Sequence, residues 1–376
     1  MTSLDGKLTT PPESNQIELS IFGPGIGECI VLHLGNNKWV VIDSCKDKSA
    51  GIPAAIKYLK ELQVNPSSSV KLFIVTHWDD DHIGGASEIL AECSNARFCC
   101  SCALLSKEFL KLTEIYSERS LMISSGTDEF WRIFQILLER RQGSRKQSAG
   151  PVWAKADTVL LETNKESHCF DVKIRALSPS DGALTLAFNE IAQLIPNENV
   201  PRRRAVAQKS NHVSVALWIT IEKAHILLGA DLENHPNQNL GWQAVLFKHD
   251  RSQQAAIVKV PHHGSFDAYS SEMWNVMAVP DPIALLTPFA SSVKPLPSQS
   301  DVKRIQRHTS QVFCTGRGIG WHPIRRNSAV ERTIRETVRT RRLIHGPMGH
   351  VRVRYYPNAK SFTPTIETFK GALLLK

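Results

Sequence analysis

The feature that most constrains the fold is an apolar strand that runs directly into a turn crowded with histidine and aspartate. Residues 70–76 read VKLFIVT, a pattern typical of a strand buried on both faces. The segment THWDDDHIGG follows at residues 76–85, and residues 84–93 have helical spacing. Ligand sites in α/β folds gather at the carboxyl ends of strands. The turn offers four candidate metal ligands, namely His77, Asp79, Asp81 and His82.

The residue types on this turn suit a divalent metal. Neutral imidazole nitrogens and anionic carboxylate oxygens together favour Zn, Mn or Fe. Gly84 and Gly85 allow a tight turn that brings the backbone close to such a site. The alternative interpretation is an acidic surface turn with incidental histidines.

Two later strand ends favour the metal interpretation. Residues 227–232 read LLGADL and place an acid just past a strand, while residues 260–265 read VPHHGS and place paired histidines just past another. A single aspartate in such a position more often caps a helix or lies in a turn. Three strand ends with metal-type ligands predict one shared site, to which the later segments add Asp231, His262 and His263.

Apolar periodicity predicts two groups of strands with helices between them. We expect strands at residues 17–22, 29–34, 38–42, 70–76, 157–162, 169–177, 213–221, 224–228, 256–260 and 283–286. Helices are expected at residues 52–62 and 84–93, and residues 105–150 read as a helical insertion or lid. The strands before residue 76 and after residue 211 could form two packed sheets, which indicates mixed α/β layers.

Length and composition narrow the class of protein. A chain of 376 residues allows one large domain or two smaller ones. No apolar run approaches the roughly 20 residues that span a bilayer, and residues 1–16 are a polar tail without the apolar core of a signal peptide. We therefore expect a soluble, cytoplasmic protein without membrane contact. Its eight cysteines are too sparse for a disulfide framework and are expected to be reduced structural thiols.

The formal net charge of +9 is concentrated near the end of the chain. Residues 317–354 contain ten arginines, no lysine and two acids, Glu331 and Glu336. Guanidinium groups bind phosphate or carboxylate in a fork, so this Arg-rich segment is either a solvated basic face or a polyanion-binding surface. Trp321, Tyr355 and Tyr356 lie near its ends and are either core residues or stacking partners for single-stranded bases.

The turn HWDDDHIGG is similar to the H-x-[HD]-x-D-H signature of the metallo-β-lactamase fold superfamily. Aspartate in the second ligand position resembles the metallo-hydrolase domain of the DNA-uptake channel protein ComEC and its soluble relatives. The resemblance covers about residues 17–316 and the final strands. Its other blocks are GPGIGECIVL at 23–32, VVIDSC at 40–45, NHVSVAL at 211–217, LLGADLE at 227–233 and VPHHGS at 260–265.

One departure concerns a histidine that relatives often carry before a proline, where this chain has Leu296 before Pro297. The role of that histidine is missing or supplied elsewhere. The channel's membrane segments are also absent, which implies a stand-alone hydrolase.

The resemblance implies an α/β, four-layer αββα sandwich with two divalent metal ions, Zn or Mn, that share a bridging hydroxide. It divides the chain into the tail at 1–16, a hydrolase domain at 17–316, and residues 317–376, which hold the Arg-rich insertion and the closing strands of the same domain. His77 and Asp79 would hold one ion, Asp81, His82 and His263 the second, and Asp231 would bridge them.

The resemblance also assigns residues to catalysis and to substrate. Asp81 and His262 would be catalytic, with His262 contacting substrate or donating a proton to the leaving group. Which of His262 and His263 is the metal ligand stays open. The expected substrate-binding residues are Asn211, Ser265, Arg325 and Arg326, and Asn211 could also ligate weakly.

Three functions are compatible with the sequence. The first is a ComEC-like nuclease or phosphodiesterase that cleaves DNA or RNA and binds nucleic acid through the Arg-rich segment. The second is a hydrolase of a small ester, lactone, lactam or phosphorylated metabolite. The third is a component of a bacterial antiviral defence system that acts with protein partners. Because one fold hosts many chemistries, the fold does not decide among them.

Overall fold

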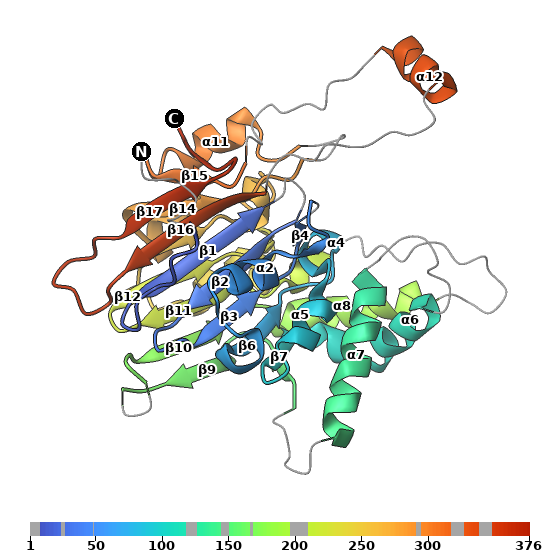
Figure 1. Cartoon of the computed structure of the whole chain (residues 1–376), viewed down its shortest axis with the longest axis horizontal. Helices are drawn as coiled ribbons and strands as arrows, with labels where there is room; N and C mark the ends of the chain where they lie inside the picture. Colours follow the sequence, from blue (N-terminus) through green and yellow to red (C-terminus); the bar gives the residue numbers. More distant parts are fainter. Residues whose placement is uncertain are drawn as a thin grey trace.

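Apolar segments, some continuous and some alternating with polar residues, form the strands of two sheets in the computed structural model of the chain (Figure 1). The structure describes residues 8–23, 27–47, 49–117, 126–143, 150–165, 168–195, 210–290, 295–316, 327–337 and 348–376. In this part of the chain, each sheet has eight strands, and a further two-stranded ribbon pairs β4 (Lys46–Asp47) with β5 (Ile52–Pro53).

The first sheet is built mainly from the N-terminal part of the chain. Its strands lie in the order β17 (Thr365–Phe369), β16 (Gly349–Tyr355), β1 (Ile17–Gly23), β2 (Cys29–His33), β3 (Trp39–Ile42), β6 (Val70–Val75), β7 (Arg97–Ser101) and β8 (Val152–Ala154). β3, β6, β7 and β8 run parallel, so their carboxyl ends share one edge.

The second sheet is built from the later part of the chain. Its strands lie in the order β18 (Leu373–Leu375), β15 (Val312–Cys314), β14 (Ala278–Leu286), β13 (Ala255–Lys259), β12 (Ala224–Leu228), β11 (Leu217–Ile221), β10 (Val172–Ala176) and β9 (Val159–Thr163). β12, β13, β14 and β15 are parallel.

Side chains of one apolar strand alternate between its two faces, so a single strand contributes to two hydrophobic cores. In β6, Leu72 and Ile74 pack between the two sheets, whereas Phe73 and Val75 pack against helices on the outer face. Successive side chains of a strand point to opposite faces, so a strand buried on both sides must be apolar throughout. This explains why residues 72–75 are apolar without polar alternation, whereas Lys71, near the start of β6, is exposed.

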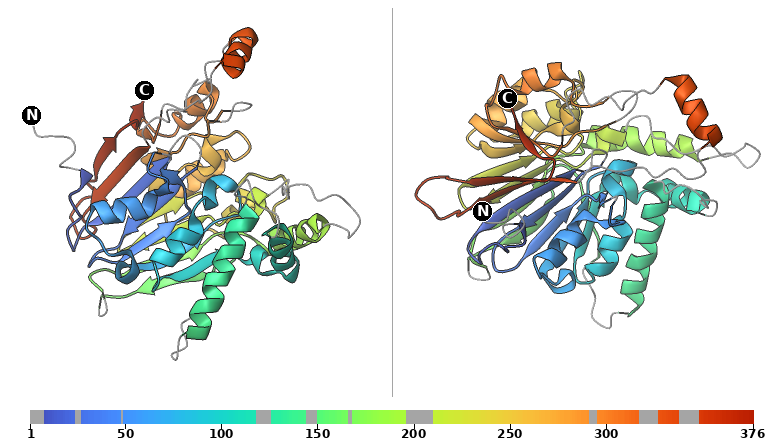
Figure 2. Two further views of the ribbon diagram at one scale, coloured as in Figure 1. Left: turned by 45° about the vertical axis from the view of Figure 1, so that its right-hand side comes forward. Right: turned by 45° about the horizontal axis from the view of Figure 1, so that its top comes forward.

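Helices cover both outer faces of the sandwich (Figure 2). The first sheet packs against α2 (Ala54–Glu61), α5 (Ala86–Glu92), α6 (Lys107–Ser117) and α7 (Gly126–Gly143). The second packs against α9 (Gly241–Lys248), α10 (Ser271–Met277) and α11 (Gln299–Ile305). The expected mixed α/β architecture, with helices outside two packed sheets, is confirmed.

The structure differs from the expected elements in local ways. The expected strand at residues 213–221 begins only at Leu217, because η2 (Ser210–Val213) precedes it and the Val215 amide donates to the Thr76 carbonyl at 3.1 Å. The expected helix at 84–93 begins at Ala86, since Gly85 has a left-handed backbone with φ 85°. The acidic turn itself forms a short helix, α4 (Asp80–Ile83).

Residues 105–150 hold α6 and α7, which pack against each other, and α7 stands beside α5 (Figure 1). The Phe109 ring packs edge-on against Phe130, with ring centroids 5.3 Å apart, and against Trp78 of the metal-type turn, at 5.1 Å. Their action as a lid stays a prediction.

Two arginines of the Arg-rich segment are structural. Arg354 Nη2 lies 2.7 Å from Glu18 Oε2, and the Glu18 side chain is fully buried. Arg352, also buried, lies 2.7 Å from Glu367 Oε2 on the neighbouring strand. Tyr355 is buried as well, which leaves it as a core residue rather than a stacking partner. Residues 317–326 and 338–347, with Trp321, Arg325 and Arg326, lie outside the described residues.

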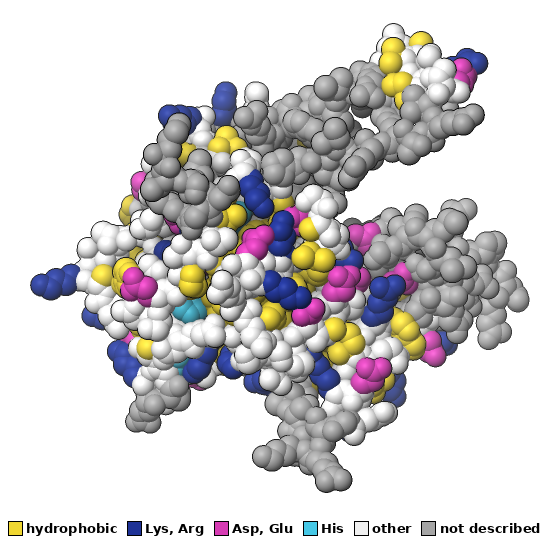
Figure 3. Space-filling model, in the orientation of Figure 1, with side chains coloured by type: hydrophobic (Ala, Val, Ile, Leu, Met, Phe, Trp, Pro, Cys, Tyr) yellow, Lys and Arg dark blue, Asp and Glu magenta, His cyan; other side chains and the backbone are white. Residues whose placement is uncertain are grey.

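The remaining charge of the described chain is well mixed. On the face in Figure 3, Lys and Arg alternate with Asp and Glu over the helices of the first sheet. Ion pairs such as Lys46–Glu88 and Lys60–Glu92 account for this pattern. Among the described residues, no helix is long and apolar enough to cross a membrane. All eight cysteines are described and none forms a disulfide.

Replacing Arg354 by alanine should destabilise the protein by about 3 kcal/mol, because it leaves the buried Glu18 carboxylate without its ion-pair partner. Urea unfolding followed by circular dichroism measures the change. The matched control is Arg332→Ala, which removes the solvent-exposed pair with Glu336 and should shift stability by less than about 0.5 kcal/mol. Equal losses in both variants would contradict the structural role of Arg354.

Candidate metal centre

Four strand ends meet at one edge of the sandwich and bring the expected ligands together. Thr76 and His77 follow β6, and α4 comes next. Asp231 follows β12, and η3 (Pro261–Gly264) follows β13 with the paired histidines. Thr287 follows β14. The edge combines the carboxyl ends of parallel strands from both sheets, which is where α/β folds place their sites.

Imidazole Nε2 atoms converge on one oxygen of the Asp231 carboxylate. Asp231 Oδ2 lies 3.4 Å from His82 Nε2, 3.7 Å from His263 Nε2 and 4.0 Å from His77 Nε2. All four side chains are buried, and they come from three segments that are distant in sequence. Glu28, His82, Asp231 and His263 form a group whose ligand-type atoms all lie within 4.8 Å of one another.

The donor set fits a divalent cation. His77 Nε2 and His82 Nε2 are buried and have no hydrogen-bond partner within the described residues. A buried polar atom without a partner is costly, and a metal ion between these nitrogens and the Asp231 carboxylate would satisfy both. The chemistry of nitrogen and carboxylate oxygen donors is that of Zn and Mn sites.

Each imidazole is oriented through its other nitrogen. His82 Nδ1 lies 2.9 Å from Asp43 Oδ2, and His263 Nδ1 lies 3.1 Å from the Thr287 carbonyl. A carboxylate or carbonyl can only accept, so both Nδ1 atoms carry the hydrogen and both Nε2 atoms face the centre. His77 Nδ1 lies 2.9 Å from Thr76 Oγ1. Such outer partners fix the tautomer and orientation of metal-binding histidines.

The two aspartates of the turn lie beside these histidines. Asp81 Oδ2 is 3.2 Å from His263 Nε2 and 3.7 Å from His82 Nε2. Asp79 Oδ2 is 3.8 Å from His77 Nε2, and 39% of the Asp79 side chain is exposed. Asp79 therefore borders the solvent side of the cluster, next to His77, while Asp81 closes the side formed by His82 and His263.

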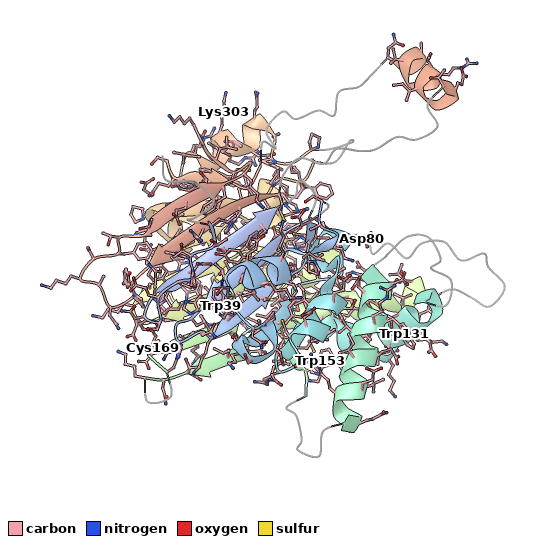
Figure 4. All side chains as sticks on the ribbon, in the orientation of Figure 1. Trp39, Asp80, Trp131, Trp153, Cys169 and Lys303 are labelled. Carbon is pink, nitrogen blue, oxygen red and sulfur yellow. The ribbon has the colours of Figure 1, made fainter. Side chains whose placement is uncertain are left out.

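Asp80, the middle acid of the turn, has a different role. Its Oδ1 accepts a hydrogen bond from the Gly126 amide at 2.7 Å and so ties the turn to the first residue of α7. Figure 4 labels Asp80 at this junction of α4 and α7. A Cβ on Gly126 would lie 1.9 Å from the Trp78 carbonyl oxygen, so only glycine lets the helix approach this closely. The helical insertion thereby supports the metal-type turn.

Glu28 and Lys259 form a fully buried ion pair beneath the cluster. Lys259 Nζ lies 2.8 Å from Glu28 Oε2 and 3.6 Å from Asp231 Oδ1, and it donates to the Ala230 carbonyl at 2.9 Å. Glu28 Oε2 also accepts from Thr287 Oγ1 at 2.6 Å. Glu28 faces the Nδ1 atoms of His82 and His263, at 3.9 Å from each, rather than their Nε2 atoms. We therefore treat Glu28 as a support for the ligands.

The paired histidines differ in their surroundings. The His263 side chain is 2% exposed and lies against Asp81, whereas the His262 side chain is 20% exposed and lies 3.3 Å from Glu233 Oε1. His262 Nε2 is 3.9 Å from Asp231 Oδ2. This geometry favours His263 as the ligand and leaves His262 at the solvent side of the centre.

Two expected substrate-binding residues contact His262. Ser265 is buried, and its Oγ lies 3.2 Å from His262 Nδ1. Asn211 Nδ2 donates to Glu233 Oε1 at 2.9 Å, and Asn211 Oδ1 is buried without a hydrogen-bond partner in the described structure. Their contact with substrate stays a prediction, and so does the role of Arg325 and Arg326, which lie outside the described residues.

Burial and charge shift the pKa values of the cluster in opposite directions. Burial lowers the pKa of His77 to about 4, with the neighbouring His82 acting in the same sense. Burial also lowers the pKa of His82, but the carboxylates of Asp231, Asp81 and Glu28 outweigh it and raise that pKa well above its usual value. Burial tends to raise the pKa of Asp231, yet His82 and His263 hold it well below its usual range. A bound cation would take the place of the proton among these carboxylates.

Sequence reasoning missed Asp43, Glu28, Lys259 and Glu233. Asp43 follows β3 and could have been found by the strand-end rule that identified Asp231. Lys259 is a charge inside the apolar segment AAIVKV, which marks a buried ion pair. Glu28 belongs to a block that carried the resemblance, although only the structure shows which atoms it faces.

Replacing Asp43 by asparagine should weaken metal affinity by about 10- to 100-fold, because His82 loses the anion that orients it. Competition between the protein and a coloured chelator measures the affinity. The matched control is Glu92→Gln, another loss of one carboxylate charge, in an exposed pair with Lys60. Unchanged affinity in a folded Asp43→Asn variant would contradict the assignment.

Comparison with known proteins gives a partial match. Residues 22–103 match the family described as the metallo-beta-lactamase superfamily. No curated protein matches the chain. The solved structure of the metallo-beta-lactamase fold protein YhfI from Bacillus subtilis is 12% identical, with 64% of this chain and 70% of that chain covered and a TM-score of 0.31. A metallo-beta-lactamase from Pontibacter korlensis is 13% identical, with coverages of 63% and 80% and a TM-score of 0.27.

Proposed function

We propose that this chain is a metal-dependent hydrolase of the metallo-beta-lactamase type, and that it acts as a phosphodiesterase of the ComEC-like type that cleaves DNA or RNA. The observation that carries the proposal is the composition of the centre. Three aspartates, Asp79, Asp81 and Asp231, lie against three buried histidines. A carboxylate-rich centre suits hard divalent ions that also bind phosphate oxygens.

The centre offers donors for two ions. His77 and Asp79 would hold one, and Asp81, His82 and His263 would hold the other. The unpartnered Asn211 Oδ1, on the side chain beside His262, would be a further oxygen donor. Asp231 lies between the two groups and would contribute to both. Two divalent metals, Zn or Mn, would activate water and stabilise negative charge at the attacked phosphorus.

His262 is the residue best placed to act on the leaving group. It is the histidine of the centre with the greatest solvent contact, and Glu233, Asn211 and Ser265 hold its ring in place. Burial lowers the pKa of His262, but the Glu233 hydrogen bond and the Asp231 charge raise it above its usual value. A protonated imidazole at the open side of the centre would donate a proton to the departing oxygen.

The same proposal implies how the protein binds nucleic acid, in which compartment it acts and with which partners. Nucleic acid would bind partly through the arginines of residues 317–347, because Arg352 and Arg354 already form ion pairs with Glu367 and Glu18. Eight free thiols suit a reducing compartment such as the cytoplasm. A partnership with proteins of a defence system remains compatible with this activity.

The purified protein loaded with Mn or Zn should cleave single-stranded or double-stranded DNA or RNA. Asp81→Ala or His263→Ala should abolish cleavage, because each removes a donor from the same side of the centre. Gel assays with end-labelled oligonucleotides measure the activity, and elemental analysis reports the bound metal. Glu92→Gln, on the exposed face of α5, serves as the matched control. Undiminished cleavage by either site variant would overturn the assignment.

Cleavage of long nucleic acid should weaken steeply as salt rises, because Arg–phosphate contacts release counterions. The double variant Arg325→Ala/Arg326→Ala should reduce the slope of log affinity against log salt by up to about 2. Fluorescence anisotropy with a labelled oligonucleotide measures the slope. A small neutral ester as natural substrate would instead show salt-independent turnover, and an unchanged slope would remove these two arginines from the nucleic-acid surface.

A further inference from the structure

We infer that a surface pocket beside the metal centre binds a nucleobase, with Phe266 as the stacking platform. The inference rests on the proposed phosphodiesterase function and defines its substrate as a phosphodiester that carries a nucleoside. The pocket has a volume of about 680 Å³. It is lined by His212, Glu233, Asn234, His235, Pro236, Gln243, Phe266, Asp267 and Tyr269.

The pocket shares a wall with the centre. Glu233 lines the pocket and lies 3.3 Å from His262 Nδ1, while the Asn211 side chain donates to the same carboxylate. Phe266 follows the ligand His263 by three residues, so their Cα atoms are at most about 11 Å apart. A phosphate at the metals therefore has its neighbouring nucleoside within reach of the pocket.

Phe266 is an exposed aromatic ring that the protein holds from one side. Its side chain is 69% exposed. The Arg304 guanidinium carbon lies 4.9 Å from the centroid of the Phe266 ring and 5.1 Å from that of Tyr269. Arg304 is itself fixed, because its Nη2 lies 2.9 Å from Asp301 Oδ1 on α11. Figure 4 labels its neighbour Lys303 on this helix.

Tyr269 belongs to the same rigid unit. Its hydroxyl lies 2.8 Å from His308 Nε2, and the His308 ring stacks on Trp274 with an interplanar angle of 7°. A cation held near one face of Phe266 leaves the opposite face for a second planar group. A ring held in place with one free face is the arrangement on which bases stack.

The charge of the pocket selects the base rather than the phosphate. Its described lining contains the carboxylates of Glu233 and Asp267 and no lysine or arginine. A phosphate would be repelled there, whereas the donors and acceptors of a neutral base would find imidazole, amide and carboxylate partners. The metals would take the phosphate, and the pocket would take the base.

Two esters with the same leaving group test the inference. Thymidine 5′-(4-nitrophenyl) phosphate carries a base, and methyl 4-nitrophenyl phosphate carries none. We expect the wild-type, metal-loaded protein to prefer the thymidine ester. In Phe266→Ala the ratio of the two kcat/KM values should fall about 5- to 140-fold, the range that corresponds to loss of one base–aromatic stack. Phe266→Trp should restore the preference.

A binding measurement separates this inference from the proposed function. Calorimetric titration of thymidine 5′-monophosphate into the metal-loaded protein should show weaker binding in Phe266→Ala than in wild type. The matched control is Phe362→Ala, a 41% exposed phenylalanine between β16 and β17 that does not line the pocket. It should leave both readouts unchanged.

The outcomes are distinct. Phe266-dependent nucleotide binding without hydrolysis of either ester would support the pocket and sink the phosphodiesterase. Hydrolysis of both esters with a ratio and a nucleotide affinity that Phe266→Ala leaves unaltered would overturn the pocket and leave the phosphodiesterase standing. Equal losses in Phe266→Ala and Phe362→Ala would also overturn it, because the effect would then not be local.

Discussion

The buried carboxylate of Asp231 is the interaction on which the candidate site depends. One of its oxygens lies 3.4–4.0 Å from the Nε2 atoms of His77, His82, His262 and His263. A carboxylate so far from water needs compensating positive charge. Lys259, buried beneath it, supplies part of this positive charge permanently. A cation bound among the imidazoles would supply the rest. The centre is therefore a cluster of carboxylates and imidazoles whose net charge favours a bound cation.

The need to surround the Asp231 carboxylate with positive charge links the two sheets of the sandwich. The turn after β6 belongs to the first sheet, whereas Asp231 and the paired histidines follow strands of the second. The contacts between them include the Val215 amide on the Thr76 carbonyl and the Glu28–Lys259 pair, each of which joins one sheet to the other. The geometry of the centre is thus set by how the two sheets pack, and the apolar interior between them determines the positions of the ligands.

The sequence predicted most of the strands, and it predicted which candidate ligands lie together at the strand ends, because both depend on local pattern. Residues 72–75 are apolar without interruption since both faces of β6 are buried there, and the histidines and aspartates stand close to strand ends. The supporting groups could not be derived in this way. Whether Glu28 faces Nδ1 or Nε2 of His82 depends on side-chain placement across two sheets, and the separate roles of His262 and His263 depend on Glu233. The charge of the Arg-rich segment was a poor guide to its role in part, because charge density says nothing about pairing. Arg352 is buried and pairs with Glu367, and Arg354 pairs with the buried Glu18.

The path of the chain between the sheets has a consequence for how the protein is made. β16 inserts between β17 and β1 in the first sheet, and β18 completes the second sheet beside β15. The candidate ligands are contained within residues 77–263, yet the two sheets are complete only after β16, β17 and β18 have been synthesised. During translation one edge of β1 stays unpaired until β16 is made, because Ile17 pairs with Tyr355, more than 300 residues downstream. An exposed strand edge invites wrong pairing, so the ribosome-bound chain is the state in which this protein is most vulnerable.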